Sequence, residues 1–171
     1  KSVGRNSVLL LNVPPNNRGL FSEPDIKRLM EFREFLDKTF SVDFAQGKKA
    51  KADSYQEGYS ASNAVDGDKN TYWAPKGTSG VLEVDLAEPT TFNVSMIKEY
   101  IALSQRVEAY SIEAFDGNEW KTIVNGTTIG HKKLDRFDDI TASKVRLKIE
   151  RSLDVPLIRN FGLFKMQKIT M

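Results

Sequence analysis

From about residue 46 onward, hydrophobic and polar side chains alternate along short segments of the chain. The alternation is clear at residues 81–86, 107–114 and 145–149, and turn-forming pairs such as Glu88-Pro89 and Asn125-Gly126 separate such segments. A period of two places every second side chain on one face of a strand, and short strands with regular turns favour an antiparallel β-sandwich or jelly roll. We therefore predict one all-β domain over residues 46–171, a length of about 125 residues that suits a single domain.

Residues 1–45 have a different pattern. Five of the seven residues at positions 7–13 are apolar and do not alternate, which is typical of a strand buried on both faces of a parallel sheet. After a loop that contains Pro and Gly, Ser22 can cap a helix, with Pro24 and Asp25 in its first turn. Apolar residues then recur at helical spacing, which predicts one long helix over residues 23–39. Strand, loop and helix make one β/α unit, which cannot form a domain alone.

Composition narrows the function classes. The 171 residues include 25 Lys and Arg against 23 Asp and Glu, a net charge of +2 that argues against a nucleic-acid partner. Cysteine is absent and His131 is the single histidine, which excludes zinc–thiolate and two-histidine metal sites within this chain. No apolar run approaches the roughly 20 residues of a membrane span. The sequence begins at Lys1 and not at a methionine, and we expect it to be a piece of a longer protein.

One stretch of the second segment is specific to a family. Residues 60–73 read Ser-Ala-Ser-Asn-Ala-Val-Asp-Gly-Asp-Lys-Asn-Thr-Tyr-Trp, and later landmarks include Asp116-Gly117-Asn118 before Trp120 and a closing Phe-Gly-Leu-Phe at 161–164. This pattern resembles the signature of the coagulation factor five/eight type C, or discoidin-like, domain. The resemblance covers about residues 46–168. It implies an eight-stranded, galactose-binding-like jelly-roll β-sandwich, often used as a carbohydrate-binding module.

A narrower resemblance indicates which longer protein contains this chain. Gln105-Arg106-Val107, Trp120 and residues 127–133 are similar to the discoidin-like domain of bacterial α-L-fucosidases of glycoside hydrolase family 29. Residues 9–15 and 18–20 resemble the last barrel strand and loop of those enzymes. The resemblance implies that residues 1–45 are the terminal β/α unit of a catalytic barrel and residues 46–171 an accessory domain. It also implies a retaining enzyme that is periplasmic or secreted, with its catalytic domain upstream of Lys1.

Catalysis by this chain alone is not expected. Such glycosidases need two facing carboxyl groups, which in a barrel lie at the carboxyl ends of strands. The only such end here is residues 12–16, which carry no acid. Glu23, Asp25 and Glu31 fall in the predicted helix, where capping and solvation explain them. We therefore expect the fragment to be inactive, while the parent hydrolyses terminal fucose from glycans.

The metal candidate is the loop at residues 63–71. Asp66-Gly67-Asp68 begins like an EF-hand loop, but Thr71 and Gly77 stand where that motif needs Gly and Glu. By itself the loop is an Asx turn. The family often binds calcium here, so the resemblance implies a structural calcium ion with the ligands Asn63, Asp66, Asp68, Thr71 and Asn160. Asn160 stands where relatives usually have Glu, which lowers the expected affinity.

Sugar rings offer apolar faces to aromatic side chains and hydroxyls to fork-like hydrogen-bond donors. The candidates of these types in or beside predicted loops are Tyr55, Tyr59, Tyr100, Gln105, Arg106 and His131. Trp73 and Trp120 each close a turn into a strand, so we assign both to the core. Two alternatives stay open: Glu99 and Arg106 can form a cross-strand ion pair, and His131 can belong to a solvated hairpin edge.

Three functional classes follow. The first is a module that binds glycans with terminal galactose or fucose, which the resemblance favours. The second is a structural spacer that buttresses the barrel and has no ligand of its own. The third is a lipid- or protein-binding discoidin-like module, which we rank last because residues 56–58 and 76–80 are polar loops without apolar spikes.

Overall fold

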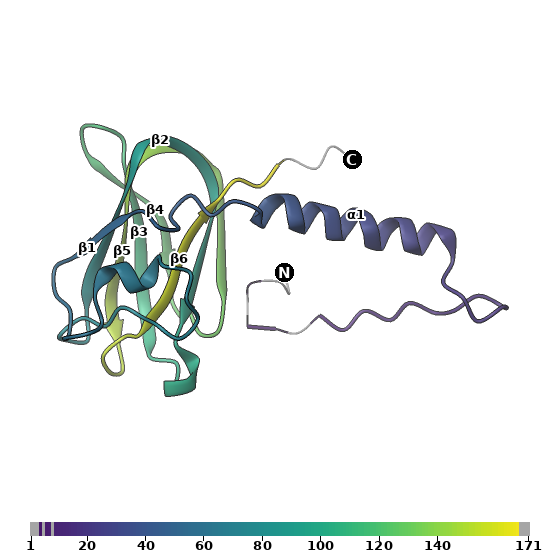
Figure 1. The fold of residues 1–171 in the computed structure, drawn as a ribbon, viewed down its shortest axis with the longest axis horizontal. Helices are drawn as coiled ribbons and strands as arrows, with labels where there is room; N and C mark the ends of the chain where they lie inside the picture. Colours follow the sequence, from purple (N-terminus) through teal and green to yellow (C-terminus); the bar gives the residue numbers. More distant parts are fainter. Residues whose placement is uncertain (1–3, 5, 8, 168–171) are drawn as a thin grey trace.

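The computed structural model describes residues 4, 6, 7 and 9–167. A helix, α1 (Glu23–Phe40), precedes six strands. Their bounds are β1 (Lys49–Ala52), β2 (Gly80–Glu99), β3 (Val107–Phe115), β4 (Trp120–Gly126), β5 (Lys133–Ser152) and β6 (Ile158–Phe164). Two single-turn 3₁₀ helices, η1 (Ala61–Ala64) and η2 (Ile101–Leu103), lie in the connections. Figure 1 shows a β-sandwich from which α1 projects.

The two 20-residue strands β2 and β5 bend and take part in both sheets of the sandwich. The first half of β2 pairs with β1 and β5, whereas its second half pairs with β5 and β6, with a register shift between Asp85 and Thr90. One sheet therefore has the order β1-β2-β5-β3-β4, and β6, β2 and β5 make the other. With both halves of β2 and β5 counted, the described residues form eight strand segments. The predicted all-β jelly-roll fold is confirmed.

The space between the sheets is the hydrophobic core. Leu82, Val84 and Leu86 point into it from alternate positions of β2, and Trp73 and Phe161 are fully buried. Burying one such aliphatic side chain contributes about 1.5–3 kcal/mol. The predicted alternation is thus the pattern of core contacts, and the assignment of Trp73 to the core is confirmed.

Trp120 lies elsewhere than predicted. It is half-buried, pairs with Phe115 across β3 and β4, and has the guanidinium of Arg146 4.3 Å from its ring centre. Phe115 lies two residues after Glu113, whose carboxylate also contacts Arg146. Since every second residue of a strand shares a face, Trp120 packs on the outer face of the five-stranded sheet.

The helix α1 agrees with the predicted range. Ser22 Oγ accepts the backbone N–H of Asp25 at 3.4 Å and donates to its Oδ2 at 2.6 Å, and Arg33 pairs with Asp37 one turn on. At the carboxyl end, the ring of Phe40 packs edge-on against Phe164, 5.1 Å between centroids. This contact joins α1 to a second apolar cluster on the outer face of the β6-β2-β5 sheet. None of the described helices is both long and apolar enough to cross a membrane.

The strand predicted at residues 7–13 is wrong for the described part of that segment. Those residues form no strand, and Leu9, Leu10 and Leu11 are exposed, Leu10 to 93%. Position 8 lies outside the described residues. A strand needs a neighbour to pair its backbone groups, and the sheets of the described chain include none of these residues.

Candidate functional site

Three tyrosine rings from separate parts of the sequence stack on one another. The rings of Tyr59 and Tyr72 lie 4.6 Å apart and nearly parallel, and those of Tyr72 and Tyr100 lie 4.8 Å apart at 33°. The pKa of Tyr72 is raised to about 12, mainly by burial and to a smaller extent by a hydrogen bond with Tyr59. The central phenol therefore stays neutral near pH 7. Two predicted residues, Tyr59 and Tyr100, meet through Tyr72, which sequence reasoning missed although it stands in the quoted family signature.

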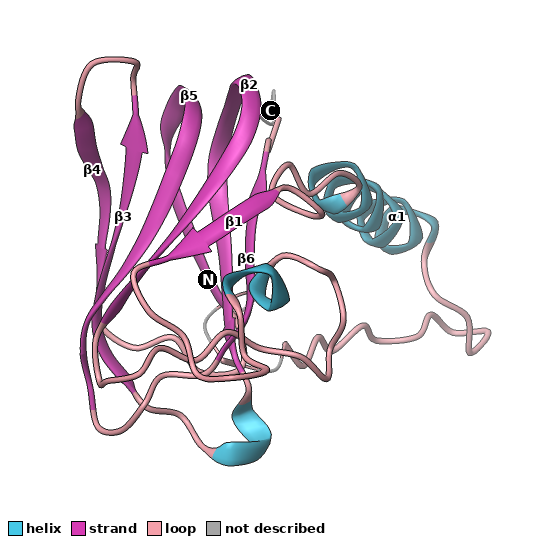
Figure 2. Ribbon diagram, turned by 60° about the vertical axis from the view of Figure 1, so that its left-hand side comes forward, coloured by secondary structure: helices cyan, strands magenta, loops and turns pink. Residues whose placement is uncertain are grey.

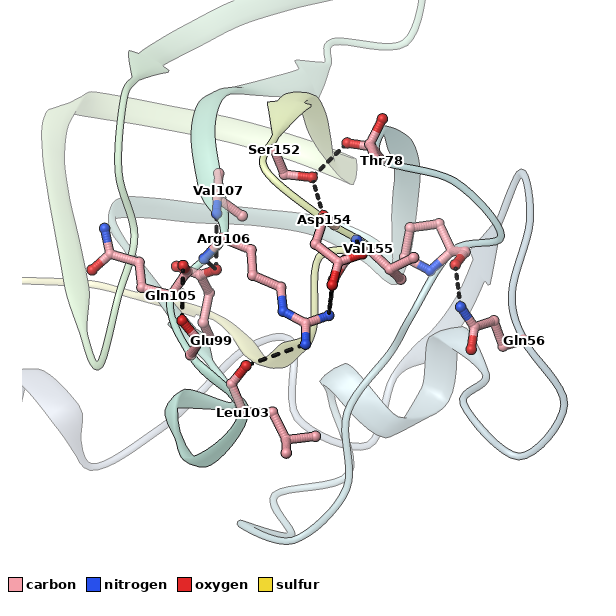
Figure 3. A network of polar contacts seen from close by, with 12 residues as sticks. Gln56, Thr78, Glu99, Leu103, Gln105, Arg106, Val107, Ser152, Asp154 and Val155 are labelled. Carbon is pink, nitrogen blue, oxygen red and sulfur yellow. Dashed lines mark hydrogen bonds and ion pairs between the residues drawn. The ribbon is translucent and has the colours of Figure 1, made fainter.

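Glu99 holds the backbone beside this stack. The residue is 1% exposed, and its Oε1 accepts the N–H groups of Arg106 at 2.7 Å and Val107 at 3.0 Å. Its Oε2 accepts the N–H of Gly130 at 2.7 Å. One buried carboxylate thus joins the turn after β2 to the turn before β5, as Figure 3 shows for the first of these turns. Glu99 contacts the backbone of Arg106 and forms no ion pair with its guanidinium, unlike the alternative drawn from the sequence.

The Arg106 side chain braces the loops at this end. Its Nη1 donates to the carbonyl of Val155 at 2.8 Å and lies 3.3 Å from Asp154 Oδ2, while Nη2 donates to the carbonyl of Leu103 at 3.2 Å. Figure 3 shows the guanidinium between these loops. Part of its hydrogen-bonding capacity is therefore used within the protein.

Gln105 belongs to the turn after β2, and His131 belongs to the turn before β5. Both are exposed, and Gln105 points away from the Arg106 guanidinium in Figure 3. Gly130 has φ +69°, a backbone conformation that glycine adopts without strain, and a Cβ there would lie 2.5 Å from Asn6 Nδ2 and 2.8 Å from Gln105 Oε1. Asn6 supports the same turn, since its Nδ2 donates to the carbonyl of Ile129 and its Oδ1 accepts the N–H of Lys132, both at 2.8 Å.

The six sugar-binding candidates therefore divide into groups. Tyr59 and Tyr100 share the tyrosine stack, and Gln105 and His131 lie on the two turns that Glu99 joins. Arg106 links the turn at Leu103 to the loop at Val155. Tyr55 is half exposed and makes no ring contact with the stack. The 3₁₀ turn η2, which carries the backbone between Tyr100 and Gln105, lies at the end of the sandwich opposite the bend of β2 (Figures 1 and 2).

The metal candidate loop brings three oxygen-bearing residues together. The hydroxyl of Thr71 lies 2.8 Å from Asp66 Oδ2 and 3.3 Å from the carbonyl oxygen of Asp68. Asp66 Oδ1 accepts the N–H of Asp68 at 2.8 Å. Gly67 has φ +81°, and a Cβ there would lie 2.5 Å from Gln46 Nε2. The loop thus has the predicted Asx turn, with oxygens of three expected ligands in mutual reach.

The other two expected ligands are placed differently. Asn63 uses its Nδ2 to brace the carbonyls of Gly58 and Tyr72, both at 3.1 Å. Asn160 lines a cavity together with Asp68. Within the described part of the chain, no group of three or more Asp, Glu or His side chains could hold a metal ion. A calcium ion here would therefore rely on backbone, hydroxyl and amide oxygens as much as on carboxylates.

Comparisons with known proteins agree with this architecture. The family model for the F5/8 type C domain matches residues 49–160. Alpha-L-fucosidase 1 of Arabidopsis thaliana is 36% identical over 172 residues, which cover 95% of this chain and 34% of the relative.

Solved structures extend the similarity. The crystal structure of SpGH29 has a TM-score of 0.92 and 34% identity, covering 97% of this chain and 37% of that one. A GH29 fucosidase of Ruminococcus gnavus, solved in complex with fucose, has a TM-score of 0.90 and 33% identity, covering 98% and 35%. A chitosan-binding module from Paenibacillus sp. IK-5, at 23% identity and a TM-score of 0.65, shares the fold. The chain spans about a third of the length of the fucosidases it matches.

Proposed function

Because the chain belongs to the F5/8 type C domain family, we propose that it is a non-catalytic, carbohydrate-binding accessory domain of an α-L-fucosidase. The similarity to fucosidases runs through both segments of the chain but covers about a third of those enzymes. That coverage supports one part of such an enzyme and not the whole of it. The stack of Tyr59, Tyr72 and Tyr100 is the observation that carries the binding role.

The tyrosine stack suits the apolar face of a sugar ring. Tyr59 and Tyr100 are the outer rings of the stack, and Tyr72 fixes their orientation from between them. Gln105 and His131 supply exposed polar groups on the two turns that Glu99 joins. A terminal galactose or fucose residue fits this chemistry, with aromatic contact to its C–H groups and hydrogen bonds to its hydroxyls. Affinity is modest, because a single exposed sugar ring makes few contacts.

The first segment supports a partner within the same protein. Leu10, Met30 and Phe32 expose large apolar surfaces, Leu10 and Met30 to 93% and 63%. An upstream catalytic barrel would cover these side chains, as the predicted β/α unit requires. That barrel would carry the nucleophile and the acid/base of a retaining fucosidase, and the whole enzyme would work in the periplasm or outside the cell.

Calcium binding at the loop of residues 63–71 forms part of the proposal. The close oxygens of Asp66, Asp68 and Thr71 support it, since calcium accepts carboxylate, carbonyl and hydroxyl oxygens. Arg159 and Lys98 line the cavity beside Asp68 and Asn160, and their positive charges oppose a cation. The ion would be weakly held and structural, fixing the loop against β6.

Two other functions each have one observation in their favour. The engagement of the Arg106 guanidinium by loop carbonyls favours a spacer that binds nothing. Exposed Ile101, Leu103 and Leu153, the last to 73%, favour an apolar lipid or protein partner. From the sequence, the lipid- or protein-binding class ranks last because of the polar loops at residues 56–58 and 76–80, and these three exposed apolar residues lie outside those loops.

A glycan array separates these functions. We expect the 171-residue chain to bind glycans with terminal galactose or fucose, and Tyr100→Ala to lose that binding while its thermal unfolding stays close to wild type.

Arg151→Ala, which changes an exposed arginine of β5 that pairs with Glu108, is the matched control for Arg106→Ala. If Arg106→Ala folds and binds every glycan as wild type does, Arg106 is structural. A folded wild-type chain that binds no glycan supports the spacer, and binding to anionic lipid vesicles in its place supports the third class.

A further inference from the structure

A cavity of about 280 Å³ lies apart from the tyrosine stack, where the carboxyl end of α1 meets β2 and β6. Its floor is the outer face of the three-stranded sheet, because Met96 and Lys98 of β2 pair with Gly162 and Asn160 of β6. None of Tyr59, Tyr72, Tyr100 or Arg106 lines it. The cavity is therefore a second concave site, separate from the one proposed above.

The walls of this cavity have two chemical characters. Phe40, Met96 and Phe164 form an apolar side, with the two phenylalanine rings packed edge-on at 5.1 Å. Lys69, Lys98 and Arg159 supply positive charge. Such a pairing of apolar wall and cations suits a small ligand that has both a C–H face and an anionic group.

The acids of the cavity already have donors. Asp43 Oδ1 accepts the N–H groups of Ala45 and Leu163, both at 3.0 Å, and Asp68 Oδ1 accepts the N–H of Asn70 at 2.8 Å. Among the residues that the structure describes, Lys98 and Arg159 have no carboxylate within ion-pair distance and donate no side-chain hydrogen bond. Lys98 and Arg159 therefore lack an acceptor of their own.

Lys98 is the most confined of these cations. Its side chain is half-buried. Burial and the charges of Arg159 and Lys132 lower the pKa of Lys98, and Asp43 offsets only part of this. The ammonium group thus lies in a positive field, which a bound anion would relieve.

We propose that this cavity binds one carboxylate-bearing sugar residue, such as a hexuronate, as a second carbohydrate site. The carboxylate pairs with Lys98 and Arg159, and the ring packs on the wall of Phe40, Met96 and Phe164. The amides of Gln46 and Asn160 line the same cavity and can reach ring hydroxyls. Its volume is near the lower limit, about 300 Å³, of pockets that enclose drug-sized ligands, so one monosaccharide residue is the right size.

A titration followed by NMR chemical shifts tests the proposal on the 171-residue chain in EDTA, which removes divalent ions. We expect glucuronate to saturate the site at millimolar concentration and to shift the amides of Lys98 and Asn160. Glucose is the neutral analogue and acetate and sulfate are the simple anions. Charge-assisted hydrogen bonds make glucuronate bind about tenfold or more tightly than glucose. Acetate and sulfate, which leave the apolar wall empty, bind more weakly than glucuronate.

Two variants locate the site. Lys98→Gln weakens glucuronate binding about tenfold or more, because one ion pair to the carboxylate is lost. Arg159→Gln does the same and replaces Lys98→Gln if that variant shows no cooperative thermal unfolding. Lys48→Gln, an exposed lysine outside the cavity, and Arg106→Ala, at the loop site, leave glucuronate binding unchanged. The loop-site proposal and the cavity proposal are therefore tested by different variants, and one can be wrong while the other holds.

Several outcomes overturn the inference. Equal affinity for glucose and glucuronate removes the role of the cations. Acetate or sulfate binding as tightly as glucuronate reduces the cavity to a site for simple ions. Binding that is unaffected in both Lys98→Gln and Arg159→Gln, or that needs calcium, places the carboxylate elsewhere.

Discussion

The first 45 residues and the sandwich are both rich in apolar residues, but they bury them to very different extents. Leu82 and Val84 of β2 are fully buried between two sheets, whereas Leu10 and Met30 are exposed to 93% and 63%. Both pairs of residues fit the apolar pattern of a buried element. The difference teaches that a pattern states which side chains need a partner surface, and that only the rest of the fold supplies one.

The largest expected difference is in activity. We expect the 171-residue chain to release no nitrophenol from an aryl α-L-fucoside, because it spans about a third of the fucosidases it matches and we propose that the two catalytic carboxyl groups lie in the upstream barrel. A longer protein that includes the proposed upstream barrel should release it. The measurement is absorbance against a buffer blank. Release by the pure 171-residue chain above that blank would place a catalytic pair within one of the two regions.

Stability should separate the two regions next. Trp73→Ala removes a fully buried ring and its hydrogen bond to the carbonyl of Ser54, and should cost about 3–5 kcal/mol of the free energy of unfolding. Met30→Ala on the exposed side of α1 should change that free energy by no more than about 0.5 kcal/mol. Urea unfolding measures both. A comparable loss in Met30→Ala would show that α1 is packed as tightly as the sandwich.

Calcium should stabilise the sandwich by a smaller amount. An ion that binds only the folded state adds RT ln(1 + [L]/Kd), about 1.4 kcal/mol at roughly ten times Kd. We expect millimolar calcium to raise the melting temperature of chelated protein, and Asp66→Ala to abolish the rise. Asp53→Ala, an exposed acid outside the loop, should keep it. An unchanged melting temperature in the wild type would end the calcium proposal.

The smallest effect concerns the outer face of the five-stranded sheet. Burial of Glu113 raises its pKa, but hydrogen bonds from Arg146 and Lys148 outweigh this and lower the pKa below the ordinary value of 4.5. The stability that Glu113 contributes is therefore present above about pH 4.5 and is lost as the pH falls through the lower, folded-state pKa. Glu113→Gln should cost about 1 kcal/mol at pH 7 and less at pH 3. Glu108→Gln, at a more exposed pair with Arg151, is the control and should cost less. A loss that is equal at both pH values would show that charge is not its cause.

Much of the architecture could be predicted because its signals are local. The cap at Ser22, the alternation around Leu82 and Val84, and the signature that ends at Trp73 each lie within a few residues of one another. Helix caps and strand faces depend on neighbours in the sequence, so a single sequence carries them. The strand expected at residues 7–13 was wrong for the opposite reason, since a strand needs a partner from another part of the fold.

The candidate sites were found in part. Tyr59, Tyr100, Gln105 and His131 were selected by residue type, but the ring that joins the tyrosines, Tyr72, was not. The sequence did not indicate the role of Glu99, because its acceptor contacts reach Gly130, which is 31 residues away in the chain. Nothing in the spacing of Lys98 and Arg159 indicated a shared cavity.

The sequence alone determined the fold class, the helix and the core-facing side chains of segments such as residues 81–86, since these follow from side-chain periods of 2 and 3.6 residues. Tertiary structure decided which side chains meet. Tyr59 and Tyr72 lie on either side of η1 in the sequence, and Tyr100 directly follows β2. The fold brings these segments together, so that the three rings stack. The physical reason is that stacking, hydrogen bonding and ion pairing act over a few ångströms in space. Distances of that kind between remote segments are set when the two sheets close over their common core.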